Sequence, residues 1–223
     1  MISIFKLLRR FLRDGLVGVL IVSAIAIFSQ FPVVAKPGQL VDVQTLIPRI
    51  QLDIRYATVQ NFTQRKLYSQ AKCLLRPGVA ARLAKVQADL AKKNLGLKVY
   101  DCYRPLAVQK KLWEIVPNPA YVANPAQGSR HNRGSAVDLT LVDLAGRELQ
   151  MPTEFDEFSE RAHLDYMGGS AQARQNRVIL QQAMKKRGFV PLVTEWWHFD
   201  DPDWQRYSVL DIPFEQVSSS GSI

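Results

Sequence analysis

The chain has three histidines, at positions 131, 163 and 198, and two of them have acidic residues close by in sequence. His131 precedes Asp138 by seven residues, in a stretch containing glycine and serine that could turn both side chains toward one point. Glu195 precedes His198 by three residues, with two tryptophans between them that could exclude water. Two histidines and one carboxylate form a usual ligand set for a catalytic zinc, which keeps a fourth position for water or substrate.

Glu195 is left outside this ligand set, where its carboxylate can serve as a base. Zinc would lower the pKa of a water molecule and polarise a carbonyl group, while Glu195 takes the proton and passes it to a leaving amine. Each feature alone has a structural explanation, because a histidine near a glycine is commonly a surface or core residue and Asp138 could satisfy a turn. Together they favour a zinc hydrolase, and the division of labour suits a peptidase with one Zn²⁺ per chain.

The segments that must position these residues alternate between helix and strand patterns. A helix opens at Pro77 and buries apolar residues at helical spacing before ending near residues 94–96. Residues 97–103 then form a strand pattern, and Pro105 starts a second helix that must stop before Pro117. Arg104 therefore lies at a strand-to-helix junction.

The remaining segments carry the candidate ligands. Residues 118–134 are rich in Pro, Asn, Gly and Ser, which predicts a long functional loop that ends near His131. Residues 136–142 are strand-like and turn back toward a partner strand around Leu149, and residues 170–187 form a capped helix. Residues 189–199 are expected to be extended with an interruption at Pro191, and residues 53–56 to be a strand or extended arm.

The amino terminus has the pattern of an export signal. A cationic stretch over residues 6–13 precedes an apolar run over residues 15–28, and this run is shorter than the roughly twenty residues that a membrane-spanning helix needs. Residues 33–35 offer a processing site. We therefore expect residues 1–35 to be a signal peptide or an N-terminal anchor, residues 36–223 to be a single zinc peptidase domain, and the protein to be exported to the periplasm or cell envelope. Membrane association is expected only if this segment stays uncleaved.

Composition limits the remaining possibilities. A chain of 223 residues with 47% hydrophobic content can bury one substantial core. The net charge is +9, and outside the cationic amino-terminal stretch the surplus is spread without a Lys/Arg block, so nucleic-acid binding is not expected. Cys73 and Cys102 are the two cysteines, and an oxidising compartment would let them form a structural disulfide. The alternative is a pair of buried free thiols.

Several motifs in order resemble the D-alanyl-D-alanine dipeptidase family, the zinc D,D-dipeptidases known from vancomycin resistance, within a wider group related to the hedgehog fold. The pattern Ser-x-His-x-x-Gly-x-Ala-x-Asp is matched by residues 129–138, and Glu-x-x-His by residues 195–198. Further similarity lies in residues 53–62, 101–105 and 155–161. The resemblance extends over residues 43–208, which is nearly the whole part expected to be exported.

The resemblance implies roles for individual residues. His131, Asp138 and His198 would bind zinc, and Glu195 would be the catalytic base. Arg104 would stabilise the negative charge that develops in the transition state, with a structural ion pair as its alternative role. The residues that hold the ammonium group of a short substrate would be Ser129, Asp156 and Tyr56.

The fold implied is α+β, with helices packed against a mainly antiparallel sheet, like that of the hedgehog and D,D-peptidase group, whose edge holds the metal. The expected partner is a small dipeptide such as D-alanyl-D-alanine. Two rival functions stay open. One is a zinc D-alanyl-D-alanine carboxypeptidase that trims longer cell-wall peptides, and the other is a non-catalytic zinc-stabilised binding module. Glu195 argues against the binding module, because a structural zinc site needs no base.

Overall fold

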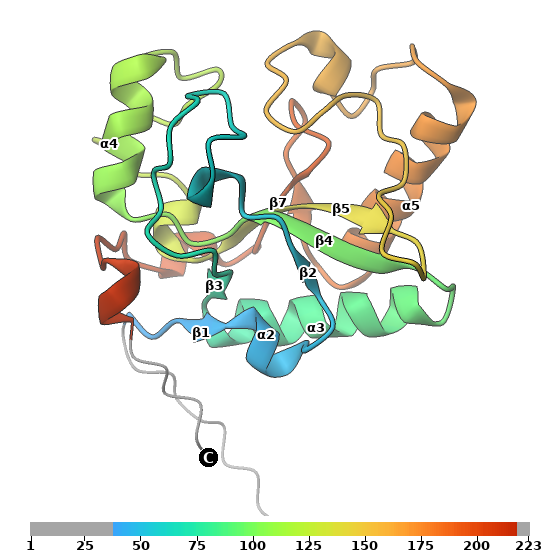
Figure 1. Cartoon of the computed structure of the whole chain (residues 1–223), viewed down its shortest axis with the longest axis horizontal. Helices are drawn as coiled ribbons and strands as arrows, with labels where there is room; N and C mark the ends of the chain where they lie inside the picture. Colours follow the sequence, from blue (N-terminus) through green and yellow to red (C-terminus); the bar gives the residue numbers. More distant parts are fainter. Residues whose placement is uncertain (1–37, 218–223) are drawn as a thin grey trace, which may run out of the picture. The chain divides into compact units, whose positions relative to one another are not determined.

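The computed structural model describes residues 38–217, and its central feature is a five-stranded sheet in the order β2-β4-β5-β7-β6 (Figure 1). The β2–β4 pair is parallel and the other three pairs are antiparallel. A small antiparallel pair, β1–β3, lies outside this sheet. The strands are β1 (Val41–Asp42), β2 (Gln51–Leu52), β3 (Leu74–Leu75), β4 (Gly96–Asp101), β5 (Ala136–Val142), β6 (Val190–Pro191) and β7 (His198–Asp200). The expected α+β class with a mainly antiparallel sheet is therefore confirmed.

Within residues 38–217, four α-helices accompany the sheet: α2 (Val43–Leu46), α3 (Pro77–Ala91), α4 (Leu106–Ile115) and α5 (Ala171–Lys186). Pro77 occupies the first turn of α3, where its fixed φ suits the helix and its missing N–H costs nothing. The apolar residues of α3 recur at helical spacing and are buried, as their pattern predicts. Ser170 caps α5, because its hydroxyl accepts a hydrogen bond from Ala173 N at 3.0 Å.

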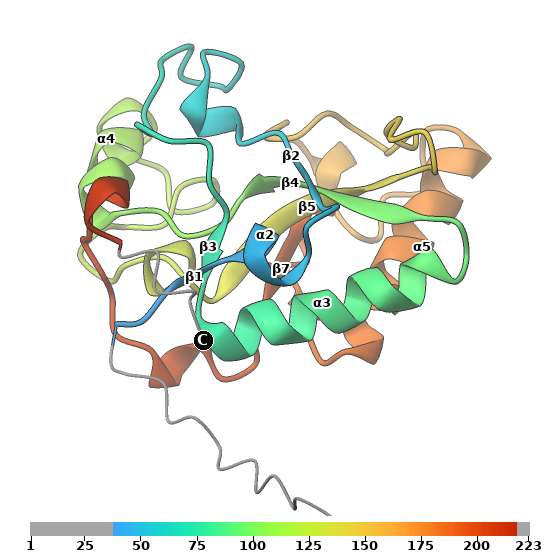
Figure 2. The same ribbon diagram turned by 60° about the horizontal axis from the view of Figure 1, so that its bottom comes forward.

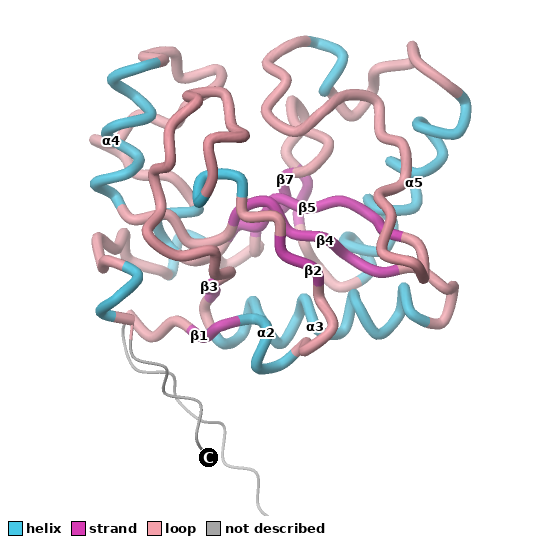
Figure 3. Tube along the Cα trace, in the orientation of Figure 1, coloured by secondary structure: helices cyan, strands magenta, loops and turns pink. Residues whose placement is uncertain are grey.

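The sheet has two differently covered faces. Helix α3 runs along one face in both views, and long connecting segments stand on the other (Figures 1 and 2). Figure 3 shows that loops rather than helices make up much of this second side. All seven residues of β5 are buried, as expected for a central strand between two neighbours. The loop-covered face is where a cleft can form over a rigid sheet.

Three local expectations were wrong. Residues 53–56 are not a continuous extended arm, because Arg55–Ala57 forms a 3-10 turn directly after β2. Residues 189–199 do not form one interrupted strand either, because turns after Pro191 separate β6 from β7. Around Leu149 there is only an isolated bridge between Val142 and Glu148, not a paired strand.

The amino-terminal segment lies outside the described residues, so the expected signal peptide or anchor over residues 1–35 remains a prediction. Within residues 38–217, no helix has both the length and the apolar character that crossing a membrane requires.

Candidate metal centre and catalytic cleft

The sheet register brings two of the predicted ligands together. Asp138 in β5 is paired with His198 in β7, and Asp101 in β4 is paired with Asp138 on its other side. Residues paired across antiparallel strands project to the same face of the sheet. Strands β4, β5 and β7 are all interior to the sheet order, so the expectation that the sheet edge holds the metal was wrong. The donor set lies over the middle of the sheet instead.

The third predicted ligand comes from a turn that precedes β5. His131 begins a 3-10 turn over residues 131–133, and Gly134 ends it with a φ of +65°, a conformation that favours glycine. The hydroxyl of Ser129 accepts a hydrogen bond from His131 N at 3.1 Å. The amide of Arg104 donates to the carbonyl of His131 at 3.1 Å. The turn is thus tied to both neighbouring segments, which fixes the imidazole over the sheet.

The three side chains point their ligand atoms at one place. His198 Nδ1 lies 2.9 Å from Asp138 Oδ1, and His131 Nε2 lies 3.4 Å from Asp138 Oδ2. The two ring nitrogens are 3.2 Å apart. Tetrahedral bonds of about 2 Å would separate ligand atoms by roughly 3.3 Å, so these distances fit a zinc-sized ion. In the part of the chain that the structure describes, this set is a group that could hold a metal ion.

Burial and charge shape the ionisation of this set. Burial alone would raise the pKa of Asp138, but the neighbouring His131 and His198 outweigh it and hold that pKa below its usual range. Burial alone would lower the pKa of His198, yet Asp200 and Asp138 together raise it well above its usual value. The site therefore concentrates opposite charges in a small buried volume, where a cation is well accommodated.

Glu195 lies beside the donor set without belonging to it. Its Oε2 is 3.8 Å from His198 Nδ1, and its side chain keeps 19% of its surface exposed. Burial raises the pKa of Glu195 above its usual value, although the nearby His198 opposes the shift. Trp196 and Trp197 are 1% exposed, so the indoles pack into the core next to this carboxylate. A carboxylate placed between a metal site and an open cleft is suited to moving protons.

A cleft of about 630 Å³ opens over the site. Its lining includes every residue that the sequence assigned to metal binding, catalysis or substrate binding. They are Tyr56, Arg104, Ser129, His131, Asp138, Asp156, Glu195 and His198. Their positions span residues 56 to 198, so the fold assembles the cleft from distant parts of the chain.

Arg104 forms part of the cleft wall and is held rigidly. Its Nη2 and Nε lie 2.7 and 3.2 Å from Asp101 Oδ2, and its Nη1 donates to Gln109 Oε1 at 2.9 Å. The guanidinium stacks over the ring of Tyr56 at 5.0 Å. Burial alone would lower the pKa of Arg104, but Asp101 raises it well above its usual value, so the side chain stays charged. Arg104 therefore has both features that its two expected roles require: an ion pair with Asp101 and a position in the cleft wall.

Tyr56 and Asp156 meet at the same wall. The Tyr56 hydroxyl donates to Asp156 Oδ2 at 2.8 Å, and Asp156 adopts a positive φ of 60°. Burial raises the pKa of Asp156 well above its usual value, and the charge of Asp138 adds to the shift. Ser129 is 7% exposed, and its hydroxyl caps the turn of His131.

Three buried residues support the site but were not singled out from the sequence. Asp200 Oδ1 lies 2.9 Å from His198 Nε2, on the side of the ring that faces away from the donor set. Asp101 is fully buried and anchors Arg104. Asn132 donates to the carbonyl of Arg104 at 2.7 Å and joins the two segments. The one available signal was position, since Asp200 follows His198 by two residues and so shares its side of a strand.

Cys73 and Cys102 form a disulfide, as expected for an oxidising compartment. The bridge joins the segment before β3 to the end of β4. The carbonyl of Cys102 lies 2.7 Å from His131 Nδ1, so the same residue also contacts a predicted ligand. The disulfide therefore fixes a backbone group that orients His131.

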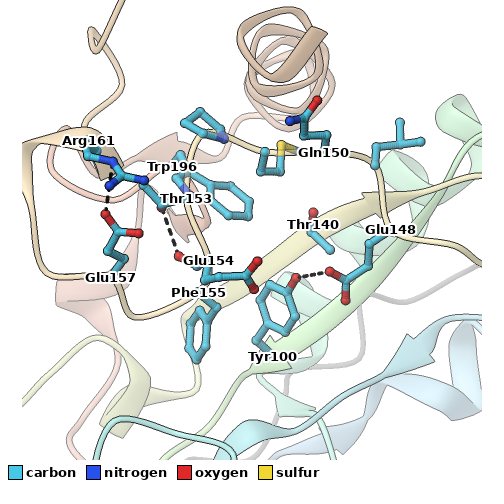
Figure 4. Close-up of a pocket in the computed structure, with 13 residues that line it drawn as sticks. Tyr100, Thr140, Glu148, Gln150, Thr153, Glu154, Phe155, Glu157, Arg161 and Trp196 are labelled. Carbon is cyan, nitrogen blue, oxygen red and sulfur yellow. Dashed lines mark hydrogen bonds and ion pairs between the residues drawn. The ribbon is translucent and has the colours of Figure 1, made fainter. Parts of the chain in front are cut away.

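A second cavity, of about 460 Å³, contains none of the eight site residues (Figure 4). Tyr100 and Thr140 lie in it beside Glu148 and Glu154, and the Tyr100 hydroxyl donates to Glu148 at 3.0 Å. Arg161 is 3.4 Å from Glu157 across its far side. Two of its four charged residues, Glu157 and Arg161, pair with each other, and none of the candidate metal ligands lies in it.

A buried His–Asp–His donor set, a separate carboxylate and an open cleft are the features of a metallopeptidase. Residues 36–219 match the model of the D-ala-D-ala dipeptidase family of peptidases, so the chain belongs to this family and the resemblance is confirmed.

Named relatives agree with this assignment. The chain is 38% identical over 184 residues to the D-alanyl-D-alanine dipeptidase of Escherichia coli (strain K12), which covers 82% of this chain and 95% of that protein. It is 31% identical over 187 residues to the D-alanyl-D-alanine dipeptidase of Enterococcus faecalis (strain ATCC 700802 / V583), which covers 74% and 88%. With the namesake of Synechocystis sp. (strain ATCC 27184 / PCC 6803 / Kazusa), it shares 27% identity over 183 residues, which covers 59% and 72%.

Proposed function

We propose that the chain is a zinc-dependent dipeptidase that hydrolyses D-alanyl-D-alanine or a closely similar D,D-dipeptide. The observation that carries this proposal is the converging donor set of His131, Asp138 and His198, with Glu195 3.8 Å from His198 in the same cleft. The choice of substrate is supported by the relatives named D-alanyl-D-alanine dipeptidase at 38% and 31% identity.

The residues that would hold the ion are His131 through Nε2, Asp138 through its carboxylate and His198 through Nδ1. Zinc bound there would lower the pKa of a water molecule toward neutrality and polarise the scissile carbonyl. The remaining chemistry falls to side chains of the chain itself.

Glu195 acts as the general base and then as the general acid. Its carboxylate accepts a proton from the attacking water as the water oxygen bonds to the carbonyl carbon. It then delivers that proton to the nitrogen as the C–N bond breaks, which releases two amino acids. The raised pKa of Glu195 suits this exchange, because a base closer to neutrality also returns its proton readily.

Arg104 stabilises the negative charge that develops on the carbonyl oxygen. Its three hydrogen bonds to Asp101 and Gln109 hold the guanidinium in place before the reaction starts. A preorganised cation stabilises the transition state more than the neutral ground state, which is the requirement for catalysis.

Asp156, Tyr56 and Ser129 bind the free ammonium group of the dipeptide. Asp156 supplies the opposite charge, and Tyr56 orients it through the 2.8 Å hydrogen bond. Such a pairing selects substrates with a free amino terminus directly beside the scissile bond, because a blocked or longer peptide leaves the half-buried carboxylate of Asp156 without its partner.

The wider setting follows from the sequence. We propose that residues 36–223 form a single zinc peptidase domain of the hedgehog-like D,D-peptidase type, and that residues 1–35 direct it to the periplasm or cell envelope. Cell-wall fragments would be the natural source of D,D-dipeptides in that compartment.

Replacing Glu195 by glutamine tests the central step. Glu195→Gln keeps the shape of the side chain but cannot accept a proton, so we expect kcat to fall by about 10²–10⁴ while one zinc ion per chain is retained. Glu160→Gln, at an exposed glutamate outside the cleft, is the matched control and should leave both unchanged. Near-wild-type turnover by Glu195→Gln would refute the proposed mechanism.

A further inference from the structure

We infer that Asp200, steadied by Arg130, is the positioning residue that presents His198 to the metal, an inference that rests on the proposed zinc function. The starting point is the orientation of the His198 ring. Its Nδ1 lies 2.9 Å from Asp138 Oδ1 and 3.2 Å from His131 Nε2, so Nδ1 is the atom that faces the donor set. Its Nε2 lies 2.9 Å from Asp200 Oδ1 on the opposite side.

A metal-binding imidazole nitrogen must be free of its proton, so a neutral His198 that binds through Nδ1 carries its proton on Nε2. That N–H is buried and needs an acceptor, and the Asp200 carboxylate is placed to provide it. The contact selects the tautomer, fixes the ring plane and makes Nδ1 a more basic ligand.

Asp200 is itself only 5% exposed, and burying a carboxylate is costly unless it is paired. Its second oxygen, Oδ2, lies 3.4 Å from Nε of Arg130. Arg130 stacks over the ring of Trp204 at 4.9 Å, and both of these residues line the cleft. Trp204, Arg130, Asp200 and His198 therefore form one connected series from the cleft wall to the ligand atom.

The other histidine ligand is oriented differently. His131 Nδ1 lies 2.7 Å from the backbone carbonyl of Cys102, a neutral acceptor that no side-chain substitution removes. Asp101 Oδ2 is farther from the same nitrogen, at 3.7 Å. Asp200 is thus the orienting contact that carries a full charge at hydrogen-bonding distance, and it can be removed without altering any of the three predicted ligands.

Asp201 offers a matched control in the next position. It is 1% exposed and its carboxylate is also buried, but it pairs with Arg82 at 3.2 Å and accepts from Asp203 N at 2.9 Å. Neither of these partners is His198. Asp201→Asn therefore removes a buried charge from the same segment and leaves the orientation of the ligand intact.

The test is zinc affinity, measured by competition with a chelator on the full chain, alongside kcat and KM at saturating zinc. We expect Asp200→Ala to weaken zinc binding by about 10–100-fold, and Asp200→Asn to be intermediate because its amide oxygen still accepts a hydrogen bond without charge. Asp201→Asn should keep wild-type zinc affinity even where its thermal stability falls.

The outcomes separate the two claims. If wild-type protein binds zinc and Asp200→Ala binds it within twofold of wild type, the inference about Asp200 is wrong. Equal losses of zinc affinity in the Asp200 and Asp201 variants would also overturn it, because they would indicate a general structural effect. If the wild-type protein binds no zinc, the proposed function fails instead.

Discussion

The hydroxyl of Tyr56 donates a 2.8 Å hydrogen bond to Asp156, joining two residues a hundred positions apart at one wall of the cleft. Tyr56 is 2% exposed and its ring lies under the guanidinium of Arg104 at 5.0 Å. Tyr56 thus contacts both the carboxylate that we propose binds substrate and the cation that we propose acts in catalysis.

Removing the charge of Asp156 should weaken binding more than turnover. In Asp156→Asn, an amide oxygen can still accept the hydrogen bond from Tyr56, but no negative charge faces the ammonium group. We expect KM to rise by at least about tenfold, because this is the usual effect of losing a charged hydrogen bond. Tyr56→Phe should raise KM less, because the carboxylate remains. Steady-state kinetics measures both, and an unchanged KM in Asp156→Asn would exclude Asp156 from ammonium binding.

Arg104 should prove sensitive even to a conservative change. Lysine keeps the charge but cannot reproduce the fork that contacts both Asp101 and Gln109, so Arg104→Lys is expected to lower kcat by about 10²-fold with little change in KM. Arg55→Lys is a suitable control, because Arg55 also pairs with an aspartate, at 2.7 Å, but does not line the cleft. If Arg104→Lys and Arg55→Lys had the same kcat, Arg104 would serve only to form a structural ion pair.

Gly134 should resist substitution because of both its backbone and its surroundings. Its φ is +65°, and an added Cβ would lie 2.5 Å from Leu40 Cδ2. We expect Gly134→Ala to destabilise the protein by about 1–3 kcal/mol and to displace the turn that carries His131. Gly169→Ala separates the two causes, because Gly169 has a φ of +73° but nothing within 4 Å of the added Cβ. Thermal unfolding of both variants measures the two losses of stability. If Gly134→Ala and Gly169→Ala lost equal stability, the contact with Leu40 would contribute nothing.

The three candidate ligands that lie together in the structure could be singled out from the sequence because metal chemistry uses few residue types. With three histidines in the chain, the spacing of His131 with Asp138 and of Glu195 with His198 left few combinations. The long helices were also predictable, since α3 and α5 have regular apolar spacing and clear start signals. The α+β class followed from the alternation of such helices with apolar strand patterns.

Features that depend on tertiary contacts were less accessible. The extended arm expected over residues 53–56 is a 3-10 turn, where the backbone must bring Tyr56 to Asp156. The expected edge position of the metal failed because strand order depends on long-range pairing, which places β6 outside β7. Asp200 was missed for a related reason. A carboxylate two residues from a histidine cannot be assigned a role until the orientation of the imidazole ring is known.

The most direct test of the account compares hydrolysis of D-alanyl-D-alanine with that of an amino-blocked, longer peptide ending in the same pair. Both are assayed as purified, after chelation and after zinc is restored. We predict that only the free dipeptide is cleaved, that chelation abolishes cleavage and that zinc restores it. Cleavage of only the longer peptide would contradict the account and indicate a carboxypeptidase, and no cleavage of either would indicate a binding module.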